Sequence, residues 1–191
     1  NKTASTDKSN TTSTKLNSNK NAIAQKRELT EVRDAADSLY KAASKLTDTS
    51  TSKSLFKKAD KVTNDITSAV KDYVKNYNSL LEEAADTTNS KVTGKVSFMT
   101  GQANAYKSSL EKVGITINSD KTLSIDEDTF KKSDISDVKK VFNGSGSMAY
   151  QTFVRASDIS SAAENASTSV TSYGADGMYN NYYNSAFNWY L

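Results

Sequence analysis

The chain has 191 residues, of which 36% are hydrophobic, with a mean hydropathy of −0.66 and a net charge of +3. This length can bury a core, but the low hydrophobic fraction favours an elongated helical protein with narrow apolar seams over a compact globule. The charge balance gives no indication of nucleic-acid binding, and no apolar run approaches the roughly 20 residues that cross a bilayer, so membrane insertion is not expected.

Three residue types are missing from the composition. The chain contains no Cys, no His and no Pro. Without Cys there is no disulfide framework and no thiolate metal site, and without His the commonest general base is also absent. Proline breaks helix interiors, so its absence favours long helices. We therefore expect a helical protein without an enzyme active site, metal or cofactor.

The first 21 residues are almost entirely Ser, Thr, Asn and Lys, with Leu16 as the one large apolar side chain. Such a segment buries too little apolar surface to offset its ordering entropy. Its lysines are too dispersed for a site that grips an anionic partner. The sequence therefore predicts a disordered arm over residues 1–21.

Heptad-like apolar spacing begins after this arm and predicts a three-helix coiled-coil stem over residues 22–113. Polar breaks near residues 47–53 and 86–90 divide the stem into three helices, which short links should fold into an antiparallel bundle. The three seams are Leu29, Val32, Ala36, Leu39, Ala43 and Leu46; Leu55, Ala59, Val62, Ile66, Ala69, Tyr73, Leu80 and Ala84; and Val92, Val96, Met99, Ala103, Tyr106, Leu110 and Val113.

The pattern changes from helical to alternating between residues 110 and 130. Apolar residues at 115, 117, 123 and 125 alternate with polar ones on either side of Asn118-Ser119-Asp120-Lys121. Asn and Asp tolerate the positive φ of tight turns, so the sequence predicts a β-hairpin. The expected fold is mainly α, an antiparallel bundle with one small hairpin. The hairpin and the helices after it, residues 114–170, should pack on the stem.

The last 21 residues form an aromatic-rich tail that follows the final predicted helix. From Ala156 onward there is no Lys or Arg. Tyr and Trp combine an apolar body with a polar tip, which suits contact surfaces. The tail either folds back onto the bundle or forms an assembly or partner surface. The residues of that candidate surface are Tyr179, Tyr182, Tyr183, Phe187, Trp189, Tyr190 and Leu191.

The densest acidic cluster is Asp120, Asp126, Glu127 and Asp128. Calcium loops use closely alternating carboxylates with an essential Gly, and this stretch has neither. Asp is also a favoured turn and helix-capping residue. The sequence therefore predicts turn and cap roles for the cluster rather than a metal site.

Three stretches together resemble the flagellar filament cap protein family, also called hook-associated protein 2. Residues 70–81, VKDYVKNYNSLL, resemble the family's F-V-x-x-Y-N-x-L helix, with Tyr73 in the place of Phe. Residues 110–130 resemble its L-x-x-L/V-G-I-x-x-x-x-D-G-x-L-x-L-D signature, with Lys121 where Gly is usual. Residues 137–144, DVKKVFNG, match its short helix ending in Phe-x-Gly. The order and spacing agree with the C-terminal half of the family.

The resemblance implies a secreted structural protein of the bacterial flagellum that acts outside the cell. Family members form a ring at the filament tip and guide flagellin insertion, so the implied partners are other copies of this chain and flagellin. This chain departs from the family because it lacks the long N-terminal half and the inserted head. It is therefore expected to be a stem fragment or a short relative.

A second function from another class stays open. The aromatic tail could make the chain a surface adhesin or binding module that captures a carbohydrate or a host protein. An assembly protein is expected to form oligomers, whereas a module can remain a monomer.

Overall fold

The structure is a computed structural model that describes residues 7–50 and 54–172, with side chains described for residues 19–50 and 54–170. It is mainly helical with one two-stranded antiparallel sheet, as the sequence predicted. The elements are α1 (Asp7–Thr47), α2 (Asn64–Asp86), α3 (Ser90–Ala103), a 3-10 turn (Asn104–Tyr106), α4 (Lys107–Lys112), β1 (Ile115–Ile117), β2 (Leu123–Ile125), α5 (Glu127–Lys132), α6 (Ile135–Phe142) and α7 (Met148–Ser172).

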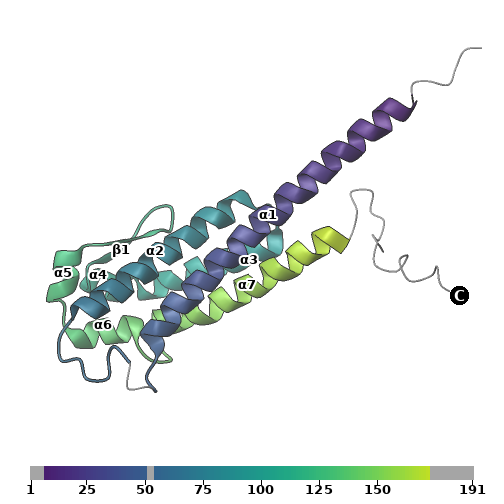
Figure 1. Ribbon diagram of the computed structural model, residues 1–191. Coiled ribbons are helices and arrows are strands. Elements are labelled where there is room, and N and C mark those ends of the chain that lie inside the picture. The colour runs from purple at the N-terminus through teal and green to yellow at the C-terminus, as the bar shows by residue number, and fades with distance from the viewer. Residues whose placement is uncertain (1–6, 51–53, 173–191) are drawn as a thin grey trace, which may run out of the picture.

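The long helices form an antiparallel bundle (Figure 1). Helix α1 packs on α2 and α7, and α3 packs on the same two helices, so the four helices close around one core. The first seam is fully buried, with every member from Leu29 to Leu46 at 0% exposure. Helix α7 presents Ala156, Ile159 and Ala163 to the core. Small side chains such as Ala156 and Ala163 on α7 allow α1 to approach closely, so α7 packs tightly on α1.

The first helix starts earlier than expected. The sequence predicted a disordered arm up to residue 21, but α1 begins at Asp7 and its N-terminal part projects beyond the bundle (Figure 1). The stretch contains neither Pro nor Gly, so adding turns to an existing helix needs no unfavourable nucleation step.

The second helix starts later than expected. Its predicted seam began at Leu55, but residues 54–63 form a loop, and α2 begins after Thr63, whose side chain accepts a hydrogen bond from the Ile66 N–H. Phe56 is 2% exposed and anchors the loop on the core. The N-cap at Thr63 therefore sets the start of α2, although a weak apolar periodicity extends back to Leu55.

The third predicted helix is interrupted between residues 104 and 106. A 3-10 turn separates α3 from α4, although Leu110 and Val113 remain buried as the seam predicted. The Tyr106 hydroxyl donates a hydrogen bond to the Gly146 carbonyl at 3.1 Å. The interruption therefore occurs where the chain is tied to the loop before α7.

The hairpin forms where the sequence predicted it, with Ile115 opposite Ile125 and Ile117 opposite Leu123. The positive φ of its turn falls on Lys121, at 72°, and not on Asn118 or Asp120 as expected. Asp120 Oδ1 instead accepts hydrogen bonds from the Thr122 N–H and hydroxyl, while the Asn118 side chain donates to the Thr122 hydroxyl. These two residues shape the turn through side-chain hydrogen bonds rather than through their backbone angles.

Lys121→Gly should therefore raise the free energy of unfolding by up to about 1 kcal/mol, because a left-handed backbone costs any residue with a Cβ roughly that much. Urea denaturation measures the change. Lys121→Ala keeps the Cβ and serves as the control, with no gain expected. A Gly variant no more stable than the Ala variant would show that φ imposes no cost here.

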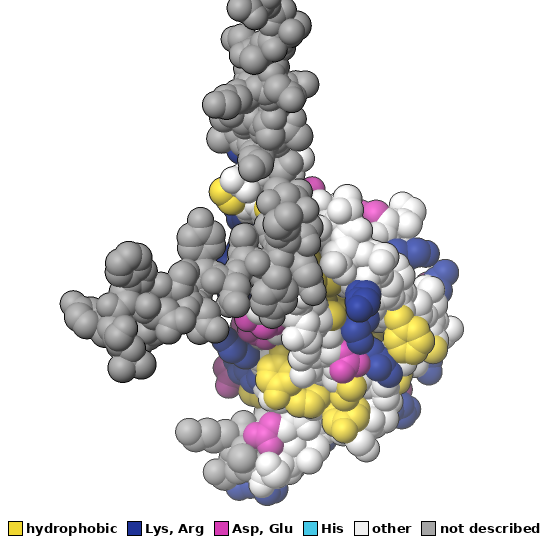
Figure 2. Space-filling view, turned by 90° about the vertical axis from the view of Figure 1, so that its right-hand side faces the viewer, with side chains coloured by type: hydrophobic (Ala, Val, Ile, Leu, Met, Phe, Trp, Pro, Cys, Tyr) yellow, Lys and Arg dark blue, Asp and Glu magenta, His cyan; other side chains and the backbone are white. Residues whose placement is uncertain are grey.

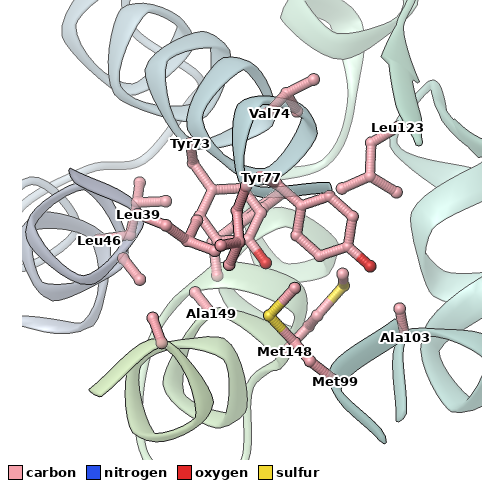
Figure 3. Close-up of a cluster of buried hydrophobic side chains, with 14 of the residues drawn as sticks. Leu39, Leu46, Tyr73, Val74, Tyr77, Met99, Ala103, Leu123, Met148 and Ala149 are labelled. Atoms are coloured by element: carbon pink, nitrogen blue, oxygen red, sulfur yellow. The ribbon is translucent and has the colours of Figure 1, made fainter. Parts of the chain in front are cut away.

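Two tyrosines of α2 lie at the centre of the core (Figure 3). The Tyr73 hydroxyl pairs with the Thr152 hydroxyl at 2.7 Å. Among the described residues, the buried Tyr77 hydroxyl has no hydrogen-bond partner. Burial raises the pKa of both phenols above the usual value, because ionisation inside the core is unfavourable.

Removal of the hydroxyl should lower the free energy of unfolding at Tyr73 but not at Tyr77. Tyr73→Phe leaves the Thr152 hydroxyl unpaired and should lower the free energy of unfolding by about 1 kcal/mol. Tyr77→Phe removes a buried group that has no partner and should leave stability unchanged or raise it by up to about 1 kcal/mol. Urea denaturation of the two variants tests this, and equal losses would contradict the assignment.

Candidate interaction surface

An open groove of about 870 Å³ lies between α3 and the C-terminal half of α7. Its α7 wall carries small side chains such as Ala162 and Ala166, which leave room beside the helix. Its α3 wall carries the exposed Lys91 and Lys95. The groove follows α7 from Asp158 to Val170, so it ends at the last turns of that helix.

In a smaller hollow next to this groove, a cation lies over an aromatic ring. The Arg155 guanidinium of α7 lies 4.8 Å from the centre of the Phe98 ring of α3. Arg155 also donates to the Gln102 side chain at 3.0 Å and to Asp158 at 3.1 Å. The contacts of Arg155 with Gln102 and Phe98 tie α7 to α3 next to the groove.

Phe98 remains 55% exposed despite this contact. Lys91, Lys95 and Phe98 are spaced i, i+4 and i+7, which places them on one face of α3. Figure 2 shows the end of the bundle that lies to the right in Figure 1, where hydrophobic side chains lie beside Lys, Arg, Asp and Glu. A small-residue wall, exposed cations and a half-exposed ring suit a polypeptide with aromatic side chains.

This surface was not predicted from the sequence. The predicted seam of this helix contains Val92, Val96 and Met99, and Phe98 lies off that seam. A large aromatic residue outside an apolar seam, with lysines on its own helix face, was the available signal. The sequence could not show that α7 forms the other wall of the groove, because this depends on how the chain folds back.

Within the acidic cluster, Asp120 shapes the hairpin turn and Asp126 caps α5, as predicted, while Glu127 and Asp128 lie in the first turn of α5. Asp126 precedes α5 and accepts hydrogen bonds from the backbone N–H groups of Asp128 and Thr129, both at 3.1 Å. Glu127 forms an ion pair with Lys71 of α2. Within residues 7–50 and 54–172, no group of three or more acidic side chains is placed to hold a metal ion. None of the described helices is long and apolar enough to cross a membrane.

These hydrogen bonds and ion pairs lower the pKa values of Asp126 and Glu127. The backbone N–H of Thr129 holds the pKa of Asp126 below its usual value, and the Lys71 ammonium does the same for Glu127. A carboxylate whose pKa is depressed on folding stabilises the fold above its unfolded pKa. That contribution is lost as the pH falls through the folded pKa.

We therefore expect the free energy of unfolding to be level between about pH 5 and pH 8, where the chain has no His to titrate, and to fall below about pH 4. Urea denaturation at each pH measures this. Asp126→Asn should flatten the acid-side decline because it removes one of the shifted groups. An unchanged decline in this variant would contradict the role of Asp126.

The seven aromatic and apolar residues predicted from the sequence as an assembly surface, from Tyr179 to Leu191, lie outside the described residues. Their role as a partner surface stays a prediction. The groove between α3 and α7 is therefore the candidate surface within the described part of the chain.

The residues that carry the family resemblance meet in space. Asn78 of α2 accepts a hydrogen bond from the Leu123 N–H and donates to the Leu123 carbonyl, both at 2.8 Å. The Phe142 ring of α6 packs edge-on against Tyr73, with ring centres 5.7 Å apart. One packing unit thus contains a residue from each of the three resembling stretches.

Comparisons with known proteins identified no relative of this chain. The family resemblance therefore stays a prediction that rests on these residues. Scans against models of protein families, against curated proteins and against solved structures found no match.

Proposed function

We propose that this chain is a non-enzymatic structural protein resembling the flagellar filament cap, which acts outside the cell by helix packing and self-association, with flagellin as its partner. The observation that carries the proposal is the contact between the three resembling stretches. They are separated in sequence, yet Asn78 binds β2 and Tyr73 packs on α6. Residues that form one packing unit are expected to be retained together, which supports treating the three motifs as one signature.

The nature of the described surface also supports an assembly role. One of its hollows is an open groove lined by small and charged side chains. Such a groove offers contact area to a polypeptide rather than an enclosed volume for a small substrate. Helices such as α1, which projects beyond the bundle, also provide surface for neighbouring copies (Figure 1).

The proposal is tested by adding the purified chain to purified flagellin and measuring filament growth and flagellin binding. We expect the chain to bind flagellin and to change the rate of growth. Asn78→Ala is the informative variant, because it weakens the shared packing unit without altering the groove. Absence of both binding and any effect on growth, in the presence of an active full-length cap protein as positive control, would contradict the proposal.

A binding module that captures a carbohydrate or a host protein is the other candidate, and the half-exposed Phe98 in the smaller hollow beside the groove favours it. Aromatic rings at the surface are common anchors in recognition. Phe98→Ala should abolish ligand capture if the chain is such a module. If the chain is an assembly protein, the same change should leave flagellin-dependent growth intact, because Phe98 does not line the groove.

A further inference from the structure

The groove between α3 and α7 is adjacent to the point where the described chain ends. Val170 lines the groove and lies two residues before the end of α7 at Ser172. Residues 173–191 are therefore attached to the chain beside the groove. This continuity makes that segment the first candidate to occupy it.

The chemistry of residues 173–191 complements the groove. The segment contains five Tyr, one Phe and one Trp, and its one charged side chain is Asp176. Exposed Lys91 and Lys95 on the groove's α3 wall can contact aromatic faces and this carboxylate. Tyrosine hydroxyls can form hydrogen bonds with Ser161, Asn165 and Ser169 on the other wall, while the rings cover Ala162 and Ala166.

The segment is also long enough. The α7 wall runs from Asp158 to Val170, and the twelve helical steps between these residues correspond to about 18 Å at 1.5 Å per residue. An extended chain covers that distance with roughly six residues. Gly174 and Gly177 allow the chain to reverse direction just after α7.

We propose that residues 173–191 dock back into the α3–α7 groove of the same chain. A segment tethered directly to the groove has a local concentration in the millimolar range, which favours this contact over the tail of another copy. The docked segment completes the bundle beside α7. This inference concerns an intrachain contact and goes beyond the proposed assembly function.

Site-directed photo-crosslinking tests the contact. The chain has no Cys, so a single introduced Cys can carry a benzophenone label at a unique position. Ser161→Cys and Asn165→Cys place the label at two exposed positions in the groove. Ser68→Cys places it on an exposed position of α2 and is the matched control. Thermal unfolding by circular dichroism selects labelled proteins that keep the wild-type melting temperature.

After irradiation and proteolysis, both groove positions should yield a crosslink to a peptide from residues 173–191, in a product with the mass of a single chain. The Ser68→Cys control should yield none. The inference is overturned if neither groove position gives this crosslink, if the control gives it equally, or if the crosslinked product has the mass of two chains. None of these results depends on whether the chain binds flagellin, so the two proposals fail separately.

Discussion

Gly114→Ala is expected to lower the free energy of unfolding by about 3 kcal/mol or more. Gly114 links α4 to β1 with a φ of +73°, which costs a residue with a Cβ roughly 1–2 kcal/mol. A Cβ here would also lie 2.9 Å from the Thr129 Cβ and 3.0 Å from the Asp126 carbonyl oxygen. Relieving that overlap must shift α5, and overpacking of this kind typically costs about 1–3 kcal/mol.

The matched control for this substitution is Gly94→Ala. Gly94 lies inside α3, and a Cβ built there has no atom within 4 Å. Alanine is favoured over glycine in a helix interior by about 1 kcal/mol, so this variant should be more stable than the wild type. Urea denaturation of the two variants should therefore give changes of opposite sign. A Gly114→Ala variant as stable as the wild type would contradict the geometry of this joint.

Asn78→Ala should lower the free energy of unfolding by about 2–4 kcal/mol, because it leaves two backbone groups of a buried residue unpaired. The Asn78 side chain satisfies both the N–H and the carbonyl of Leu123, which is 2% exposed. It thereby pairs with β2 much as a neighbouring strand would, and fixes the hairpin on α2. Chemical denaturation measures the loss of stability.

Asn76→Ala is the control for Asn78→Ala on the same helix. Its side chain donates only to the Asp72 carbonyl one turn earlier, so no other element depends on it. Alanine is a better helix former than asparagine, and stability should stay level or rise slightly. Asn78→Asp should behave like the Ala variant, since a carboxylate cannot donate to the Leu123 carbonyl. A neutral effect of Asn78→Ala would show that the hairpin is held by its apolar side chains alone.

Periodicity predicted those features of the fold that depend on which residues are buried. The first seam is buried throughout, the alternating residues form the hairpin, and Asp126, which belongs to the cluster with predicted turn and cap roles, caps α5. In each case a local rule and the tertiary packing favour the same structure. Agreement of this kind is what makes a sequence predictable.

The remaining features depend on contacts between distant residues. The loop before α2 is held by Phe56 and by the Lys139 ammonium, which donates to the Ala59 carbonyl. The break after α3 accompanies the bond from Tyr106 to Gly146. The pairing of α1 with α7, which also places one wall of the groove, joins the two ends of the described chain through Tyr40 stacked on Phe153. No local pattern specifies such pairs.

At Lys121 in the hairpin turn, the departure from the family pattern has a physical consequence for the backbone. Lysine stands where the resembling family usually has glycine, and its φ of 72° is the conformation that glycine adopts without cost. The turn keeps its shape because Asp120 and Asn118 bind Thr122. The departure is therefore expected to cost stability rather than to change the fold.

We propose that this chain acts by associating with itself and with a filament protein, and sedimentation equilibrium over a wide range of protein concentrations measures the self-association. The mass of a self-associating chain should rise with concentration above the 20.8 kDa of one chain and level off at a defined oligomer. A mass of 20.8 kDa at every concentration would contradict self-association and favour a monomeric binding module.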